Sequence, residues 1–200
     1  LVNEFVNANK IVQVHPFSNN SGLVADRKNV FLAQPSYKQQ AIKALDYIAN
    51  VSTIKTVSIY FGTAKKDSLF ADVYKNYARS LGYKIQKFQR FNAKAQKLEK
   101  DEGHIFLAAD NNLGSRFLQL AFASEVNSEI ICTATSFNWE SVSKSVFSEH
   151  VSIIYPEFID KTKNAVVLFS KNYSNKMAIK PSYYAYAGYD AMLYYGRMLK

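Results

Sequence analysis

Polar loops that follow or end extended apolar runs are the parts of this sequence best suited to hold a ligand. The runs cover residues 10–15, 104–109 and 129–133. The ligand-capable side chains beside them are Ser18, Asn19, Asn20 and Ser21, then Asp110 and Asn111, and then Thr133 and Thr135. Ser, Asn and Thr offer neutral donors and acceptors, which suit an uncharged or anionic polar group better than an ammonium. The set predicts a small polar ligand, with Asp110 as the one carboxylate that could serve a cation.

Asp110 and Asn111 have a competing structural role. They stand directly before the helical pattern of residues 113–123, so either can act as its N-cap. The same helix N-terminus offers unpaired N–H groups to a ligand. Replacing Asp110 by Asn separates the two roles, because Asn also caps a helix but carries no charge.

No catalytic or metal-binding motif stands out. The sequence lacks the P-loop, the dinucleotide-binding glycine pattern and the G-x-S-x-G elbow. His15, His104 and His150 lie far apart and none has metal-ligand spacing. Cys132, the single cysteine, lies in an apolar run and is predicted to be a buried, inert thiol. We therefore expect a protein that is not an enzyme and has no cofactor or metal, although a Ser/His/Asp constellation assembled by the fold stays open.

The net charge of +9 admits an anionic partner. The lysines are scattered, and the densest stretch, residues 84–100, has no recognition helix, zinc signature or aromatic array beside it. We interpret it as a solvated basic face and expect no nucleic acid among the partners. Any DNA binding should be weak and sensitive to salt.

Short apolar runs alternate with amphipathic stretches between residues 55 and 155, which indicates the fold class. Strands are predicted at 56–61, 83–88, 104–109, 129–133 and 150–155, and helices at 68–81 and 113–123. This alternation is typical of α/β proteins with parallel sheets flanked by helices. Such sheets bind ligands at the carboxyl ends of their strands. No apolar run approaches the roughly 20 residues of a membrane span.

Three helices have readable faces. In the helix that follows Ser36, the predicted buried residues are Ala41, Ala44, Leu45 and Ile48. In the 68–81 helix they are Leu69, Val73 and Tyr77, and Gly82 is predicted to end this helix. The last helix, 182–199, spreads its tyrosines over so many faces that it should be covered on more than one side. A further helix is predicted around residues 165–173, and residues 2–8 read as the end of another.

Three segments together resemble the type I periplasmic-binding-protein superfamily, in particular the leucine/isoleucine/valine-binding proteins of ABC importers. Residues 12–23 are similar to the family's strand and polar loop. Residues 30–40 are similar to its first crossover between lobes, and residues 181–191 to its late helix with Tyr-Ala and Gly-Tyr-Asp-Ala.

The resemblance implies two lobes with an incomplete N-terminal lobe. Residues 1–35 and 156–200 would form part of the N-terminal lobe, and residues 36–155 a complete C-terminal lobe. The sequence would then be a piece of a longer protein exported to the periplasm or cell envelope.

The resemblance also implies a function. The family holds an amino acid between its lobes, with the Ser18–Ser21 position on the ligand carboxylate. Residues 133–138 lack the carboxylate that the family uses for the ammonium, which argues against a free α-amino acid. The leading hypothesis is a non-enzymatic ligand-binding module, with a membrane permease or cell-wall component as possible partner. The alternative is an envelope structural or regulatory interaction domain that has lost small-molecule binding. An α/β enzyme is a third reading and a nucleic-acid binder a fourth.

Overall fold

The structure is a computed structural model that describes residues 2–94 and 97–198. The chain forms two compact units. Unit 1 consists of residues 1–36 and 156–200, and unit 2 of residues 37–155.

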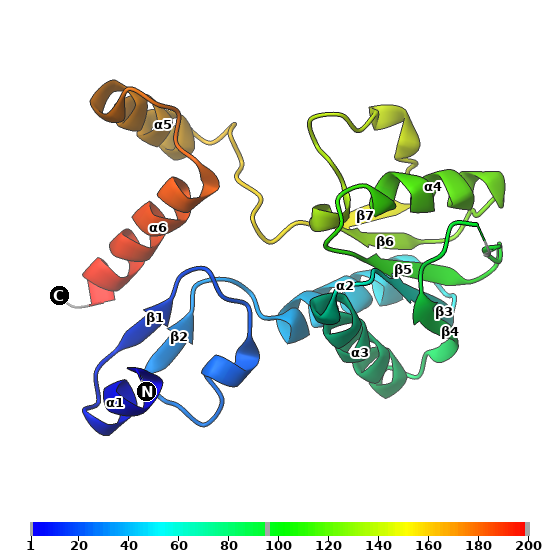
Figure 1. Cartoon of the computed structure of the whole chain (residues 1–200), viewed down its shortest axis with the longest axis horizontal. Coiled ribbons are helices and arrows are strands. Elements are labelled where there is room, and N and C mark those ends of the chain that lie inside the picture. Colours follow the sequence, from blue (N-terminus) through cyan, green and yellow to red (C-terminus); the bar gives the residue numbers. More distant parts are fainter. Residues whose placement is uncertain (1, 95–96, 199–200) are drawn as a thin grey trace. The chain divides into compact units, whose positions relative to one another are not determined.

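Unit 2 is built on a parallel sheet, as the alternation of strands and helices predicted (Figure 1). Its strands are β3 (Thr56–Phe61), β4 (Lys84–Arg90), β5 (Gly103–Leu107), β6 (Ile130–Thr133) and β7 (Val151–Ile154). Their order in the sheet is β4-β3-β5-β6-β7, and every neighbouring pair is parallel. The α/β fold class is therefore confirmed.

Helices cover both faces of this sheet, which explains why its strands read as continuous apolar runs. Helices α2 (Tyr37–Val51) and α3 (Lys65–Ser80) lie on one face, and α4 (Leu113–Ala123) lies on the other (Figure 1). Alternate residues of β3 serve the two sides: Ile59 packs with α2 and α3, whereas Tyr60 packs with α4. Cys132 is buried on the α4 side, and this burial raises the pKa of its thiol. The prediction of a buried thiol is confirmed.

The predicted face of α2 is confirmed, whereas that of α3 is wrong at Leu69 and only partly buried at Val73 and Tyr77. Leu69 is 55% exposed, and the residues of α3 that are buried are Asp67, Phe70, Ala71, Tyr74 and Ala78. Residues spaced by four drift by about 40° per step around a helix with 3.6 residues per turn, so Leu69 lies farthest from the buried side, while Val73 and Tyr77 come closer to it and pack partly against the core. The buried set alternates steps of three and four, which holds it against the sheet.

Gly82 ends α3 as predicted. Its φ of 80° lies in the left-handed region, which costs glycine little. The N–H of Gly82 donates to the carbonyl of Arg79, and the N–H of Tyr83 donates to that of Ala78, both at 3.0 Å. This pair of bonds is a Schellman motif, and it turns the chain directly into β4.

Unit 1 is the smaller of the two. It holds α1 (Val2–Ala8), β1 (Gln13–His15), β2 (Val30–Leu32), α5 (Asn164–Met177) and α6 (Tyr183–Met198), and β1 pairs with β2 in parallel. Aromatic contacts join these elements to α6. The ring centroid of Phe31 in β2 lies 6.5 Å from that of Tyr195, and the ring centroid of Phe169 in α5 lies 5.0 Å from that of Tyr186.

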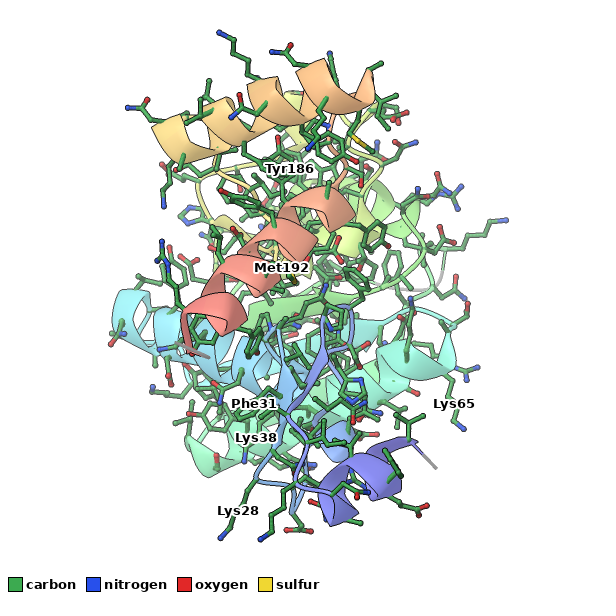
Figure 2. The ribbon with its side chains drawn as sticks, turned by 90° about the vertical axis from the view of Figure 1, so that its left-hand side faces the viewer. Lys28, Phe31, Lys38, Lys65, Tyr186 and Met192 are labelled. Carbon is green, nitrogen blue, oxygen red and sulfur yellow. The ribbon has the colours of Figure 1, made fainter. Side chains whose placement is uncertain are left out.

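The predicted cover of α6 on more than one side is found only in part: its rings meet Phe31 of β2 and Phe169 of α5, but none of its hydrophobic side chains among the described residues is buried. Tyr184 is 61% exposed and Met192, on a free face of the helix, is 77% exposed (Figure 2). Of the buried hydrophobic side chains among the described residues, only Val6 and Val30 belong to unit 1. Unit 1 thus has exposed apolar faces and only a small hydrophobic core.

Candidate functional site

The carboxyl edge of the unit 2 sheet contains a topological switch point, the place where open parallel sheets bind ligands. After β3 the chain enters β4 on one side, and then crosses to β5 on the other side of β3. In an open parallel sheet, the loops that leave two such strands diverge and leave a crevice where ligands bind. Here those loops are residues 62–64, between β3 and α3, and residues 108–112, between β5 and α4.

The side chain of Asp67 joins these two loops. Its Oδ1 accepts a hydrogen bond from the N–H of Ala109 at 3.0 Å, and its Oδ2 accepts one from the N–H of Ala64 at 3.3 Å. Burial raises the pKa of this carboxyl group, against the effect of the two backbone donors. Sequence reasoning missed Asp67. The available signal was its place three residues after Ala64, where an acidic side chain can reach back to the start of a helix.

Two glycines allow the loops to pack closely. A Cβ on Gly62 would lie 2.4 Å from Oδ2 of Asp67. A Cβ on Gly114, in the first turn of α4, would lie 2.6 Å from the carbonyl oxygen of Ser136 and 2.7 Å from the ring of Phe137. The carboxyl edge is therefore a tightly packed surface, in which the loops hold one another.

Gly114→Ala should lower the free energy of unfolding of unit 2 by about 1–3 kcal/mol, because the added methyl group forces α4 away from the backbone of residues 134–136. Trp139, the single tryptophan, belongs to unit 2, so its fluorescence in a urea titration follows this unit. The control is Gly188→Ala in α6, where, apart from the chain neighbours and the helix's own backbone, no atom of the described residues would lie within 4 Å of the added carbon. Equal unfolding midpoints for Gly114→Ala and the parent chain would contradict the close packing.

The two predicted threonines lie together, but their hydroxyl groups have internal partners. Thr133 is buried and accepts from the N–H of Ala108 at 3.3 Å. Thr135 is exposed, and its hydroxyl donates to the carbonyl of Ala108 at 2.7 Å. Both tie the end of β6 to the end of β5. The hydroxyl group of Thr133 therefore has a structural role. The hydroxyl oxygen of Thr135 can still accept a hydrogen bond from a ligand, but its proton is already donated.

Asp110 and Asn111 are exposed at the same edge, and neither is the N-cap of α4. The N-cap is Asn112, without a side-chain capping bond. Asp110 instead accepts from the backbone N–H of Asn112 at 2.9 Å and from its side-chain amide at 3.2 Å. The predicted capping role is wrong, because the short Asp side chain closes a local turn two residues ahead and the helix starts one residue beyond it.

The predicted loop of unit 1 follows β1. Ser18 accepts from the N–H of Asn20 at 3.3 Å, and Asn20 accepts from the N–H of Gly22 at 2.9 Å as the cap of a 3₁₀ turn, Ser21–Leu23. Asn19 is half-buried, and Ser21 is exposed. These four residues belong to unit 1 and the other four predicted residues to unit 2, so their joint site stays a prediction.

A buried polar cluster in unit 2 was not predicted. Ser58 donates to Oε1 of Glu102 at 2.5 Å, and the same oxygen lies 4.0 Å from Nδ1 of His104. His104 Nε2 lies 2.9 Å from the carbonyl oxygen of Glu99; because a carbonyl only accepts, this nitrogen carries the proton. All three side chains are almost inaccessible to water. Since Ser58 donates to the carboxylate and not to the histidine, the cluster lacks the proton relay of a catalytic triad.

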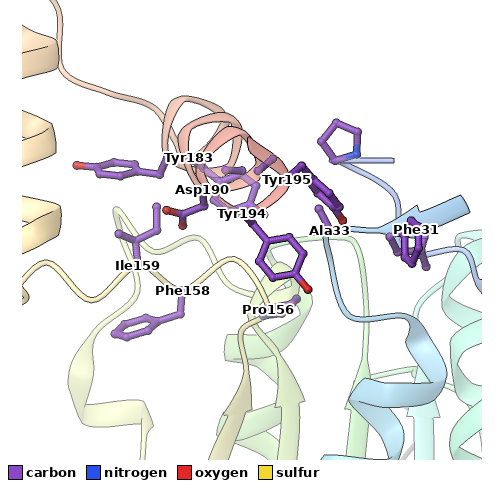
Figure 3. Close-up of a pocket in the computed structure, with 14 residues that line it drawn as sticks. Phe31, Ala33, Pro156, Phe158, Ile159, Tyr183, Asp190, Tyr194 and Tyr195 are labelled. Carbon is purple, nitrogen blue, oxygen red and sulfur yellow. The ribbon is translucent and has the colours of Figure 1, made fainter. Parts of the chain in front are cut away.

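A cavity of about 500 Å³ lies in unit 1, between the end of β2, residues 156–159 and α6 (Figure 3). Apolar side chains and tyrosines line it, among them Phe31, Phe158 and Tyr194, and Asp190 is its one carboxylate. Gln34 donates to the hydroxyl of Tyr183 at 2.8 Å on its border. The cavity is a hollow in the apolar faces described above, and sequence reasoning did not predict it.

Within the described residues, no three His, Cys, Asp or Glu side chains come together as ligands for a metal ion. Over the same ranges, no helix has the length and hydropathy to cross a membrane.

Solved structures decide what this topology is. A substrate-binding protein of an ABC transporter from Desulfitobacterium hafniense matches 96% of this chain with a TM-score of 0.64 and 20% identity. A leucine-binding protein from Thermotoga maritima matches 96% with a TM-score of 0.58 and 16% identity. The chain has the fold of the type I periplasmic-binding proteins. It spans 58% of the length of each of these two proteins, so it carries a little over half of that fold.

A third structure with this fold is a solute-binding protein of an ABC transporter from Rhodopseudomonas palustris, in complex with 3,4-dihydroxybenzoic acid. It matches 96% of the chain, with 12% identity, 56% of its own length and a TM-score of 0.55. At these identities the likeness establishes the periplasmic-binding-protein fold and not the ligand. No family model matches the sequence, and no match was found among curated proteins.

Proposed function

We propose that this chain is a non-enzymatic ligand-binding module of an exported bacterial protein, which holds a small polar ligand between two lobes. Unit 2 would be the C-terminal lobe, and unit 1 part of the N-terminal lobe. The observation that carries the proposal is the carboxyl edge of the unit 2 sheet. There the backbone is fixed by Asp67 and the threonines, whereas Asp110 and Asn111 stay exposed at the point where such sheets bind ligands.

The chemistry of the predicted residues suits a ligand with a carboxylate. The substrate-binding protein from Desulfitobacterium hafniense was solved in complex with leucine, and the Rhodopseudomonas palustris protein with an aromatic acid. Both ligands carry a carboxylate, for which Ser18, Asn19, Asn20 and Ser21 would supply neutral donors. Asp110 is the carboxylate of the set, and would pair with an ammonium group where the ligand has one.

The proposal includes a place and a partner. A similar structure is titled a periplasmic ligand-binding protein of a branched-chain amino acid ABC transporter, from Burkholderia xenovorans. By analogy the module would work in the periplasm or cell envelope, and would deliver its ligand to a membrane permease or a cell-wall partner.

Asp110→Asn should weaken the binding of leucine about tenfold or more and leave the binding of 3,4-dihydroxybenzoic acid within about twofold. The substitution removes a charge-assisted hydrogen bond to an ammonium, which only leucine has, while Asn can keep the turn that Asp110 forms with Asn112. Calorimetric titration of the purified chain measures both affinities. Asp101→Asn is the matched control, because Asp101 is also exposed but lies before β5, at the amino edge of the sheet.

The alternative function is an envelope interaction domain that no longer binds small molecules. The observation that favours it is Asp67, whose buried carboxylate bridges the loops after β3 and β5, at the point where a ligand would bind. A thermal-shift screen against amino acids, small amides, aromatic acids and cell-wall fragments separates the two functions. A ligand present at 100 times its Kd stabilises the folded state by about 2.7 kcal/mol, which raises Tm visibly. If no compound raises Tm, the alternative replaces the binding module.

A further inference from the structure

Four aromatic side chains form a cluster beside the carboxyl ends of β6 and β7 in unit 2. Phe137 follows the 3₁₀ turn Ala134–Ser136 that ends β6, and Tyr155 directly follows β7. Trp139 and Phe147 come from the connection between these strands. The indole N–H of Trp139 donates to the carbonyl of Ala134 at 2.9 Å, which fixes the ring over the end of β6. The cluster therefore borders the same sheet edge as Thr135.

The cluster is ordered as a stack. The ring of Trp139 is parallel to those of Phe147 and Tyr155, with an interplanar angle of 5° and a centroid distance of 5.8 Å in each case. Phe137, which is 3% exposed, supports the stack from the core at 5.5 Å from Trp139 and 5.2 Å from Phe147. Packing on Phe137 holds the rings in place before a ligand binds. Binding would therefore cost little side-chain conformational entropy.

The exposure of this stack needs an explanation. Trp139 is 45% exposed and Tyr155 is 43% exposed, although both are large apolar rings. The other large hydrophobic side chains of unit 2 that are exposed lie on the helices: Tyr47 and Val51 on α2, Leu69 on α3 and Phe122 on α4. Scattered exposed residues are normal on a soluble protein, whereas adjoining exposed rings beside the carboxyl edge of a parallel sheet mark a binding surface.

We infer that Trp139 and Tyr155 form a stacking platform for a ligand that carries a flat aromatic ring together with an acidic group. The inference rests on the proposed function and names its ligand class. The ring would lie against the exposed part of the stack, since aromatic rings attract one another in offset or edge-to-face contact. Thr135 follows Ala134, which accepts the indole N–H, so its neutral hydroxyl group lies beside the platform and would contact a polar group of such a ligand.

The test uses the full chain with 3,4-dihydroxybenzoic acid and leucine as probes. Trp139→Leu should weaken the binding of the aromatic acid about tenfold in calorimetry and change that of leucine less than twofold, because only the aromatic acid has a ring to stack. Trp139→Phe keeps a ring and should retain most of the affinity for the aromatic acid. Phe122→Leu is the control. Phe122 is 87% exposed, so this substitution also removes an exposed ring, but on α4 and outside the platform. Circular dichroism confirms that each variant is folded.

Two further measurements keep the inference testable if Trp139→Leu fails to fold. In the unaltered chain, the aromatic acid should change the emission of Trp139, the only tryptophan, whereas leucine should not. Tyr155→Leu should also weaken the binding of the aromatic acid more than that of leucine. Equal affinity of the parent and Trp139→Leu for the aromatic acid overturns the platform and leaves the proposed function standing. Binding of neither probe, nor of any compound in the thermal-shift screen, overturns the proposed function and the platform with it.

Discussion

Phe117→Ala should lower the free energy of unfolding of unit 2 by about 3–5 kcal/mol, the range for a fully buried phenylalanine. Phe117 in α4 is 0% exposed. Its ring stacks on Phe106 of β5 at 4.5 Å and meets Tyr60 of β3 at 5.6 Å and Phe91 at 5.4 Å. Truncation removes one ring from contact with three others, and a rigid parallel sheet closes over the resulting cavity only in part. A loss of this size is a large fraction of the 5–15 kcal/mol by which domains are usually stable.

The same helix supplies the matched control. Phe122, also in α4, is 87% exposed, so Phe122→Ala should change the stability by no more than about 0.5 kcal/mol. Urea titrations followed by the fluorescence of Trp139 compare both variants in the same unit. Equal losses for Phe117→Ala and Phe122→Ala would show that α4 does not pack on the sheet through the face described here.

The parts of the fold that follow from local pattern were predictable. The strand 56–61 was found at its predicted bounds, and so was the helix 113–123, because apolar runs of strand length and a clear helical period leave little room for another structure. Gly82 was predictable for a related reason. A helix often ends with a residue in the left-handed conformation, and glycine adopts that conformation at little cost in free energy.

The errors arose where tertiary packing decides between local possibilities. In α3 the sequence contains a row of apolar residues at intervals of four, but the sheet selects Phe70, Ala71, Tyr74 and Ala78, and two of these are small alanines with a weak hydrophobic signal. In α6 the tyrosines indicate an apolar helix on several sides. Sequence does not tell an apolar face that is covered from one that is open, as Tyr184 and Met192 are.

The polar clusters were not predictable, because they depend on register between strands. Ser58 of β3 lies directly opposite His104 of β5, although the two are far apart in sequence. Asp67 can accept a hydrogen bond from Ala109 only because β3 and β5 are neighbours in the sheet. Each contact joins a residue with no motif around it to a partner that the topology supplies.

Unit 2 should lose about 3 kcal/mol of stability as the pH falls from about 6.5 to about 4, owing to His104 alone. The pKa of this imidazole is lowered from 6.5 to about 4: burial is the main cause, the carbonyl of Glu99 opposes it, the charge of Lys87 adds to it, and the charge of Glu99 opposes it as well. In this interval the unfolded chain binds a proton that the folded chain does not. The unfolded state is therefore favoured increasingly until the folded histidine also becomes protonated near pH 4, below which the contribution stays constant.

His104→Gln tests this expectation, because glutamine keeps an N–H donor for the carbonyl of Glu99 but does not titrate. The difference in unfolding free energy between the parent chain and His104→Gln should shift by about 3 kcal/mol in favour of the variant between pH 7 and pH 4. His150→Gln, at a histidine whose side chain is 38% exposed, should leave most of the loss in place. A constant difference between the parent and His104→Gln across this range would contradict the expectation. A difference that shifts in favour of the parent as the pH falls would mean that His104 is already protonated in the folded state, with the carboxylate of Glu102, 4.0 Å from Nδ1, as its partner. The buried cluster would then be an ion pair at neutral pH, and its contribution to stability would have the opposite sign of pH dependence.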